Sequence, residues 1–199
     1  SQVPLPGGLT GREVAERMLR QNGIEDVRVT SVAGQLTDHY DPTKKRVNLS
    51  DSVYASNSIA AAAVAAHECG HAVQHACAYA PLKLRSRLVP IVSFSSNIVQ
   101  WVLLAGMLLI KTFPQLMLIG IVMFALTTLF SFITLPVEID ASRRALAWLK
   151  TSGLTSRETD SMARDALQSA AYTYVVAALG SLATLLYYIL IFTSGSRRD

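Results

Sequence analysis

Three long stretches without a charged residue constrain the fold of this sequence more than any other feature. Each is close to the about 20 residues that an α-helix needs to cross a bilayer, and they cover residues 88–110, 116–137 and 170–192. Buried helices of a soluble bundle are the competing interpretation, but three uncharged stretches of this length seldom occur in a small soluble fold. The sequence therefore predicts a membrane helical bundle.

The composition agrees with a chain that exposes much of its surface to lipid. Charged residues make up 16% of the 199 residues, whereas a soluble domain carries about 25%. The net charge of +4 is too small to indicate nucleic-acid binding, and basic cytoplasmic loops would give the same balance. Cys69 and Cys77 stand too far apart along a helix to bridge each other, which fits a reducing compartment. The chain starts at Ser1, without Met and without a signal peptide, so we expect it to be the interior of a longer precursor.

The basic residues predict how the bundle is oriented in the membrane. Cytoplasmic loops carry an excess of Lys and Arg, and the link 111–115 carries only Lys111. The N-terminal part and the segment 138–169 should therefore share the cytoplasmic side, although Arg197 and Arg198 count against this arrangement. The basic residues on the predicted cytoplasmic side are Lys83, Arg85, Arg87, Arg143, Arg144, Lys150, Arg157 and Arg164.

Residues 1–55 have a polar, mixed composition that predicts a small α/β unit. Thr10 with Glu13 forms a capping-box pattern, and Asn22-Gly23 ends the helix that follows. Strands are expected around 27–32 and 47–49, with a turn at 38–45 between them.

Residues 56–80 are rich in alanine and lack proline, which predicts one long helix that ends before Pro81. Ser56 or Asn57 would cap it. Three histidines and a glutamate in its second half argue against lipid exposure there. The expected fold class is mainly α: a membrane helical bundle over residues 81–199, with the α/β unit and this helix before it.

His67-Glu68-Cys69-Gly70-His71 matches the pattern H-E-x-x-H, as in the catalytic helix of zincin metallopeptidases. Residues four apart share one face of a helix, so both imidazoles can reach the same zinc ion. Glu68 then stands beside a metal-bound water as its general base. A pair of helix histidines that only pack is the competing interpretation.

A catalytic zinc site needs a third protein ligand. His75 lies about 12 Å along the helix axis from His67, too far to share the ion without a break in the helix. Gln74 and Cys77 stand where the metzincin pattern has Gly and His. His75 is therefore expected either to contact the zinc ligands without binding the ion or to have a structural role. Glu138 is the better candidate, because a carboxylate just inside the membrane interface is costly unless it pairs with a cation or metal.

Alternatives remain open for the polar residues around this site. Glu138 could instead snorkel, cap a helix, or pair with Arg143 or Arg144. Asp140 either orients a zinc-ligating histidine or caps the next helix. The strand near Val47, if it is an exposed edge, could pair with an extended substrate. Donors that could stabilise an oxyanion are His39, Tyr40, Arg143 and Tyr174, of which the first two lie in a turn that could cover the cleft.

These residues resemble the YugP-type neutral zinc metallopeptidases, which are bacterial membrane proteins. The matching segments are LTDHYDP (36–42), SIAAAAVAAHECGHAVQH (58–75), APLKLRSRLVP (80–90), TLPVEIDASRRAL (134–146) and AAYTYVVAALGSL (170–182). The resemblance implies a zinc-dependent, endopeptidase-like activity, a location in a bacterial plasma membrane and a further transmembrane helix upstream of Ser1. A more distant likeness is to the HtpX and CAAX-protease metallopeptidases, whose pattern has Asp four residues after the ligand glutamate, where this chain has Ser142.

The sequence thus predicts an integral-membrane zinc metalloendopeptidase with one zinc ion, acting on a protein or peptide on the cytoplasmic side and in contact with membrane lipid. The alternative is a zinc-binding membrane protein without peptidase activity, such as a sensor or scaffold. The intact Glu68 speaks against a degenerate enzyme. The sequence names neither a particular substrate nor an oligomeric state.

Overall fold

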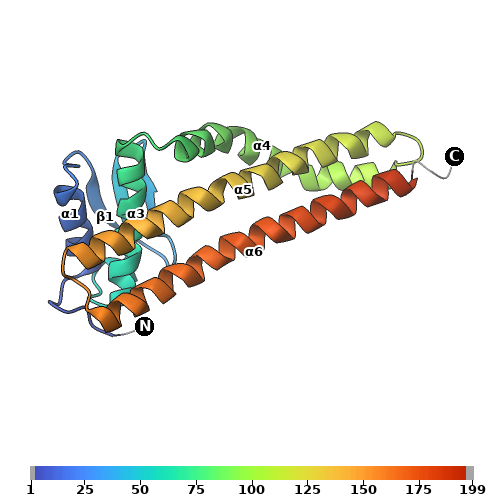
Figure 1. Cartoon of the computed structure of the whole chain (residues 1–199). Coiled ribbons are helices and arrows are strands. Elements are labelled where there is room, and N and C mark those ends of the chain that lie inside the picture. The colour runs from blue at the N-terminus through green and yellow to red at the C-terminus, as the bar shows by residue number, and fades with distance from the viewer. Residues whose placement is uncertain (1–2, 196–199) are drawn as a thin grey trace. The chain divides into compact units, whose positions relative to one another are not determined.

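The computed structural model describes residues 3–195, which form six helices and one three-stranded sheet (Figure 1). The mainly helical fold class predicted from the sequence is confirmed. The chain divides into two compact units. Unit 1 comprises residues 1–82 and 137–172, and unit 2 comprises residues 83–136 and 173–199.

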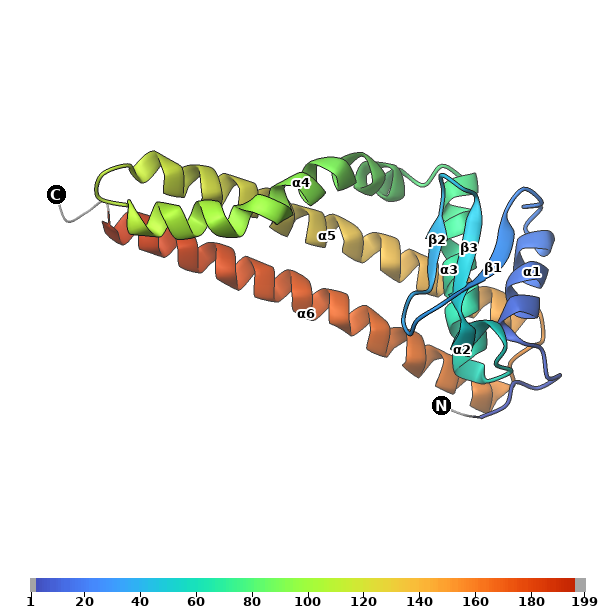
Figure 2. The ribbon, with the colours of Figure 1, turned by 180° about the vertical axis from the view of Figure 1, so that it is seen from behind.

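The N-terminal α/β element of unit 1 begins with α1 (Gly11–Gln21). The predicted capping box is confirmed, because the Thr10 hydroxyl accepts from the Glu13 amide while the Glu13 carboxylate accepts from the Thr10 amide. Strands β1 (Arg28–Val32), β2 (His39–Asp41) and β3 (Arg46–Ser50) follow, in the order β1-β3-β2 (Figure 2). β3 pairs parallel with β1 and antiparallel with β2.

Two predictions about this sheet are wrong. The segment 38–45 was expected to be a turn, but His39–Asp41 forms β2, because Tyr40 packs against the core and pairs with Val47. The turn itself is shorter: the Asp41 carboxylate accepts from the amides of Thr43 and Lys44. The strand near Val47 is not an edge, since β3 lies between β1 and β2, which are the two edge strands of the described sheet.

A short helix, α2 (Asp51–Tyr54), precedes α3 (Ile59–Ala76), the helix that carries the histidine pair. The cap is Ser58 rather than Ser56 or Asn57: its side chain accepts from the Ala61 amide. The helix also ends earlier than expected, at Ala76 with Cys77 as its C-cap, and Ala78 then turns the chain with a left-handed φ of 56°.

The core of unit 1 forms around α3 because its alanines let neighbouring elements approach closely. Five of these alanines, at positions 62, 63, 65, 66 and 72, are at most 1% exposed. Val14 and Met18 of α1, with Val47 and Leu49 of β3, complete this cluster on the N-terminal side. The ends of the long helices add further members, Ala145, Leu149, Ala163 and Leu167.

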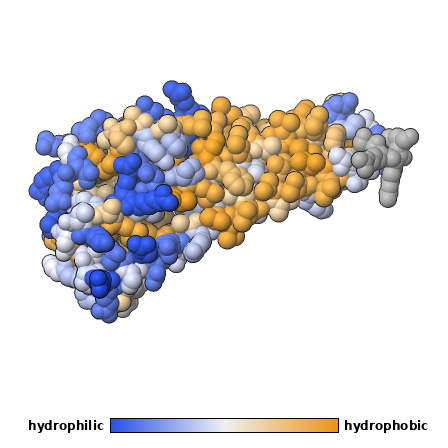
Figure 3. Space-filling model, in the orientation of Figure 1, coloured by the Kyte–Doolittle hydropathy of each residue, from blue (hydrophilic) through white to orange (hydrophobic). Residues whose placement is uncertain are grey.

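The three apolar stretches lie within α4 (Ala80–Leu108), α5 (Pro114–Thr151) and α6 (Arg157–Gly195). Each helix is long and apolar enough to cross a bilayer. α5 continues through Pro136 to Thr151, so the segment 138–169 is made of two helix ends and a short connection rather than a separate element. Figure 3 shows apolar side chains covering the helices of unit 2 on the face in view.

Candidate metal centre

His67 and His71 lie one turn apart on α3 and direct their Nε2 atoms at one carboxylate oxygen. The distance to Oε2 of Glu138 is 3.2 Å from His67 and 3.6 Å from His71. The two rings meet edge to face, with centroids 4.8 Å apart. Glu138 is 3% exposed and His71 8%. The structure therefore brings the three sequence-predicted ligands together in a nearly buried cluster.

The three side chains fit a zinc ion. Ligands about 2.1 Å from a tetrahedral zinc ion lie about 3.4 Å from one another, and the two distances to Glu138 bracket this value. The ligand-type atoms of all three residues lie within 4.8 Å of one another. Two imidazoles with one glutamate are also a known donor set of catalytic zinc, which keeps a fourth position open.

Gly70 explains how a carboxylate from a distant helix reaches the two histidines. A Cβ atom at this position would lie 2.6 Å from the backbone oxygen of Ala141, closer than real side chains come. The glycine therefore lets the backbones of α3 and α5 approach where Glu138, one turn before Ala141, faces the histidine pair. The sequence pattern does not reveal this role of Gly70, because the close contact is with the backbone of a different helix.

The other ring nitrogen of each histidine also has a partner. Nδ1 of His67 is 3.1 Å from the Ser142 hydroxyl, and Nδ1 of His71 is 3.0 Å from Oε1 of Gln74. Partners at Nδ1 orient a ligating imidazole and leave Nε2 for a metal. Gln74 was missed as a supporting residue; a lone amide three residues after His71 was the available signal.

Glu68 is 8% exposed and follows His67 on α3. Burial raises the pKa of its carboxyl group, and the negative charges of Glu138 and Asp38 act in the same direction, while the two histidines oppose them. A carboxyl group whose pKa lies above its usual range holds a proton more readily during a reaction.

Asp140 and His75 both make defined contacts outside the three-residue cluster. The Asp140 carboxylate accepts from Nε2 of Gln74 at 2.9 Å and from Nε of Arg144 at 2.6 Å. Asp140 thus touches neither histidine directly. His75 contacts the Tyr40 hydroxyl through Nδ1 at 3.1 Å, and it does not belong to the cluster of His67, His71 and Glu138.

The remaining candidate oxyanion donors, His39, Arg143 and Tyr174, are not part of the cluster of His67, His71 and Glu138. His39 donates from Nδ1 to the Thr37 carbonyl at 2.7 Å, and its Nε2 accepts from the Asn48 side chain at 3.0 Å. Both ring nitrogens thus stabilise the sheet. Arg143 is exposed, and Tyr174 lies in the part of α6 that belongs to unit 2.

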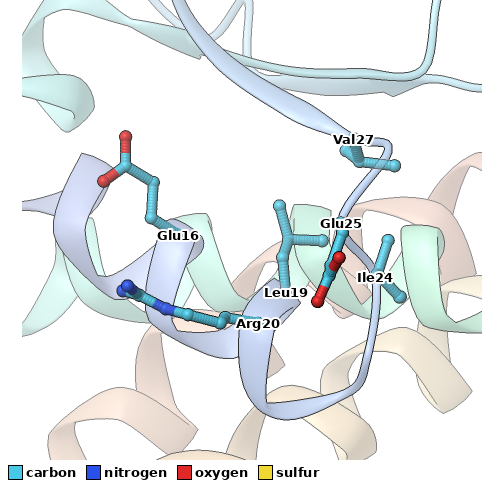
Figure 4. A pocket seen from close by; sticks show the side chains of 6 residues that line it. All are labelled: Glu16, Leu19, Arg20, Ile24, Glu25 and Val27. Carbon is cyan, nitrogen blue, oxygen red and sulfur yellow. The ribbon is translucent and has the colours of Figure 1, made fainter.

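A surface hollow of about 350 Å³ lies elsewhere in unit 1, between α1 and the segment that leads into β1 (Figure 4). It contains no histidine and none of the candidate ligands. The residues that line it are Glu16, Leu19, Arg20, Ile24, Glu25 and Val27. The candidate site is therefore defined by converging ligand atoms rather than by this hollow.

The chain is similar to known proteins over almost its whole length. Residues 1–193 match a family model described as putative neutral zinc metallopeptidase. The chain is also 44% identical, over 195 residues, to the "Putative membrane protease YugP" of Bacillus subtilis (strain 168). This alignment covers 98% of the chain and 86% of that protein. No solved structure matches the chain.

Proposed function

The chain belongs to the family of putative neutral zinc metallopeptidases, and on this premise we propose that it is a membrane-embedded zinc endopeptidase that hydrolyses peptide bonds of protein or peptide substrates. His67, His71 and Glu138 would hold one zinc ion, and Glu68 would act as the general base. The support comes chiefly from the convergence of two imidazole Nε2 atoms on Oε2 of Glu138, with both Nδ1 atoms engaged by other side chains.

The residues of the site divide the work of hydrolysis between them. Zinc, when bound, would polarise the scissile carbonyl and increase the acidity of a water molecule. The carboxylate of Glu68 accepts a proton from the attacking water and donates it to the nitrogen of the leaving amine. Because Glu68 is nearly buried, its carboxyl group can hold this proton between the two steps without exchanging it with bulk water.

Strand β2 is the best candidate for binding the substrate backbone. It is one of the two edge strands of the described sheet, and its Tyr40 contacts His75 on α3, one turn beyond His71. An extended peptide that added to this edge would form main-chain hydrogen bonds next to the helix of the histidine pair. We propose that the site faces the cytoplasm. Most basic residues lie next to those ends of the predicted spans that adjoin the site, and cytoplasmic loops carry an excess of Lys and Arg.

The replacement Glu68→Gln tests the proposal and separates it from a zinc-binding protein without peptidase activity. We expect cleavage of an unstructured test protein to fall by at least about 10²-fold, the usual contribution of a general base, while zinc stoichiometry stays the same. The assay uses the full chain in detergent, with metal content measured on the same sample.

Glu25→Gln is the matched control, because Glu25 is an exposed glutamate away from the cluster; it should leave both quantities unchanged. Stoichiometric zinc without chelator-sensitive cleavage in the wild-type protein would favour the sensor or scaffold. Wild-type cleavage by Glu68→Gln would exclude Glu68 as the base.

A further inference from the structure

Gln74 stands out because its amide is fully buried and makes hydrogen bonds at both ends. It is 0% exposed. Nε2 donates to the Val137 carbonyl at 2.8 Å and to the Asp140 carboxylate at 2.9 Å, and Oε1 lies 3.0 Å from Nδ1 of His71. A carboxamide offers two N–H donors, so both are used and no polar atom of this side chain is left over.

These partners fix which way the amide points. A carbonyl and a carboxylate both accept hydrogen bonds only, so the nitrogen of Gln74 must face Val137 and Asp140, and its oxygen must face His71. Nδ1 of His71 therefore carries a hydrogen and donates it to Oε1. The lone pair of the neutral imidazole is thereby placed on Nε2, the atom directed at Glu138.

The same amide also holds the turn of α5 that carries Glu138. Val137 directly precedes Glu138 and Asp140 follows two residues later, so the two hydrogen bonds of Nε2 lie on both sides of the candidate ligand. Asp140 is held in turn by Arg144, one turn further along α5, at 2.6 Å. A chain of contacts thus runs from Arg144 through Asp140 and Gln74 to His71.

Ser142, the partner of His67, does not fix the tautomer of that histidine as Gln74 does for His71. Ser142 offers a hydroxyl, which can donate or accept and rotates to suit its neighbour. Its contact with Nδ1 of His67 at 3.1 Å therefore fits either tautomer. The two histidines of the cluster differ in how firmly their tautomers are set, and this difference provides an internal control.

We propose that Gln74 is a positioning residue that sets the tautomer of His71 and aligns it with Glu138 for metal binding. This inference rests on the proposed metal centre. Gln74 touches no candidate substrate position and acts only through His71 and the backbone of α5. Removing such a partner of a ligating histidine typically weakens metal binding by 10–100-fold.

The test measures metal affinity rather than cleavage alone. Gln74→Met keeps the length of the side chain and removes all its hydrogen bonds. We expect zinc and cobalt affinities, determined by competition with a chelator in the full-length protein, to fall by about 10–100-fold. The visible absorption of bound cobalt should change as well, because His71 loses its fixed orientation. Ser142→Ala should cause a smaller loss than Gln74→Met.

Asp140→Asn provides a second variant in case Gln74→Met does not fold. It removes the charge that links Gln74 to Arg144 but keeps the size of the side chain. A loss of several-fold in zinc affinity by this variant supports the proposal. Circular dichroism and thermal unfolding identify the variants that keep their fold.

The outcomes separate the two proposals. If the wild-type protein binds neither zinc nor cobalt stoichiometrically, the metal centre itself is wrong. If the wild-type protein binds metal and cleaves its substrate, while folded Gln74→Met or Asp140→Asn keeps wild-type affinity and the same cobalt spectrum, only the role of Gln74 is overturned.

Discussion

Units 1 and 2 use opposite kinds of surface to stabilise their helices. Unit 1 buries a continuous apolar cluster around α3. Its polar side chains Glu68, Gln74 and Glu138 are also buried, and Gln74 and Glu138 have defined partners. Unit 2 has a smaller buried cluster, made of Val99, Leu103, Met117 and Ile121, and leaves many large apolar side chains exposed. In the most apolar window of α6, only 6% of the residues are buried.

This difference in burial indicates that the two units are stabilised by different interactions. In water, burying apolar surface stabilises a fold by about 25 cal/mol per Å², and unit 1 has the enclosed core that this requires. Helices in lipid gain nothing from hiding apolar side chains from lipid tails, so close packing and interhelical hydrogen bonds have to hold them together. Unit 2 shows both features, at Gly106 against Met117 and at Thr128 against Ser181.

Replacing one glycine at a close contact between long helices in each unit should give the largest effects. A Cβ at Gly70 would lie 2.6 Å from Ala141 O, and one at Gly106 would lie 2.6 Å from Met117 Cα. We expect Gly70→Ala and Gly106→Ala each to lower the free energy of unfolding by about 1–3 kcal/mol, the usual cost of overpacking. Only Gly70→Ala should also weaken zinc binding. Thermal unfolding in detergent and zinc titration measure these two quantities.

Gly180→Ala is the control for both glycines, because nothing lies within 4 Å of a Cβ at this position in α6. It should keep or slightly raise stability, since alanine favours a helix by about 1 kcal/mol over glycine. Equal zinc affinity in Gly70→Ala and Gly106→Ala would break the assignment of the metal centre to the contact between α3 and α5.

Removing the capping box of α1 should give an intermediate effect that depends on pH. Thr10→Ala should cost about 1 kcal/mol, as for other N-cap replacements. Hydrogen bonds from the amide and hydroxyl of Thr10 hold the pKa of Glu13 below its usual value of 4.5. Because the folded pKa is lower than the unfolded one, this contribution is present above about pH 4.5 and is lost as the pH falls through the folded value.

The variant Glu13→Gln isolates this pH dependence. The difference in melting temperature between wild type and Glu13→Gln should shrink as the pH is lowered from 7 towards about 4, where the carboxyl group begins to protonate. A difference that stays constant over this range would show that the carboxylate of Glu13 does not contribute through its charge.

The hydrogen bond between α5 and α6 in unit 2 should give the smallest effect. The Thr128 and Ser181 hydroxyls lie 2.7 Å apart, and such bonds between membrane helices contribute about 0.6 kcal/mol on average. A double-mutant cycle with Thr128→Val and Ser181→Ala, followed by unfolding in detergent, measures this coupling. A coupling free energy well above the stability lost in Thr10→Ala would contradict the view that unit 2 depends mainly on packing.

Local patterns explain which parts of the molecule could be predicted. The capping box at Thr10, the strands around Val29 and Val47, and the apolar spans all follow from neighbouring residues. β2 was missed because a three-residue strand with Asp and His has no strong propensity of its own. Pairing with β3 and the packing of Tyr40 stabilise it. The end of α3 was misplaced because Ala78, not Pro81, breaks the helix.

The sequence by itself determined the apolar spans and the pairing of His67 with His71, because helical periodicity places residues four apart on one face. Only the tertiary structure decided which carboxylate faces them and what holds them in place. Glu138 lies 71 residues beyond His67 along the chain, and its approach depends on the contact of Gly70 with Ala141. The link from His71 through Gln74 to Asp140 likewise joins two helices, and no periodicity within either helix specifies it.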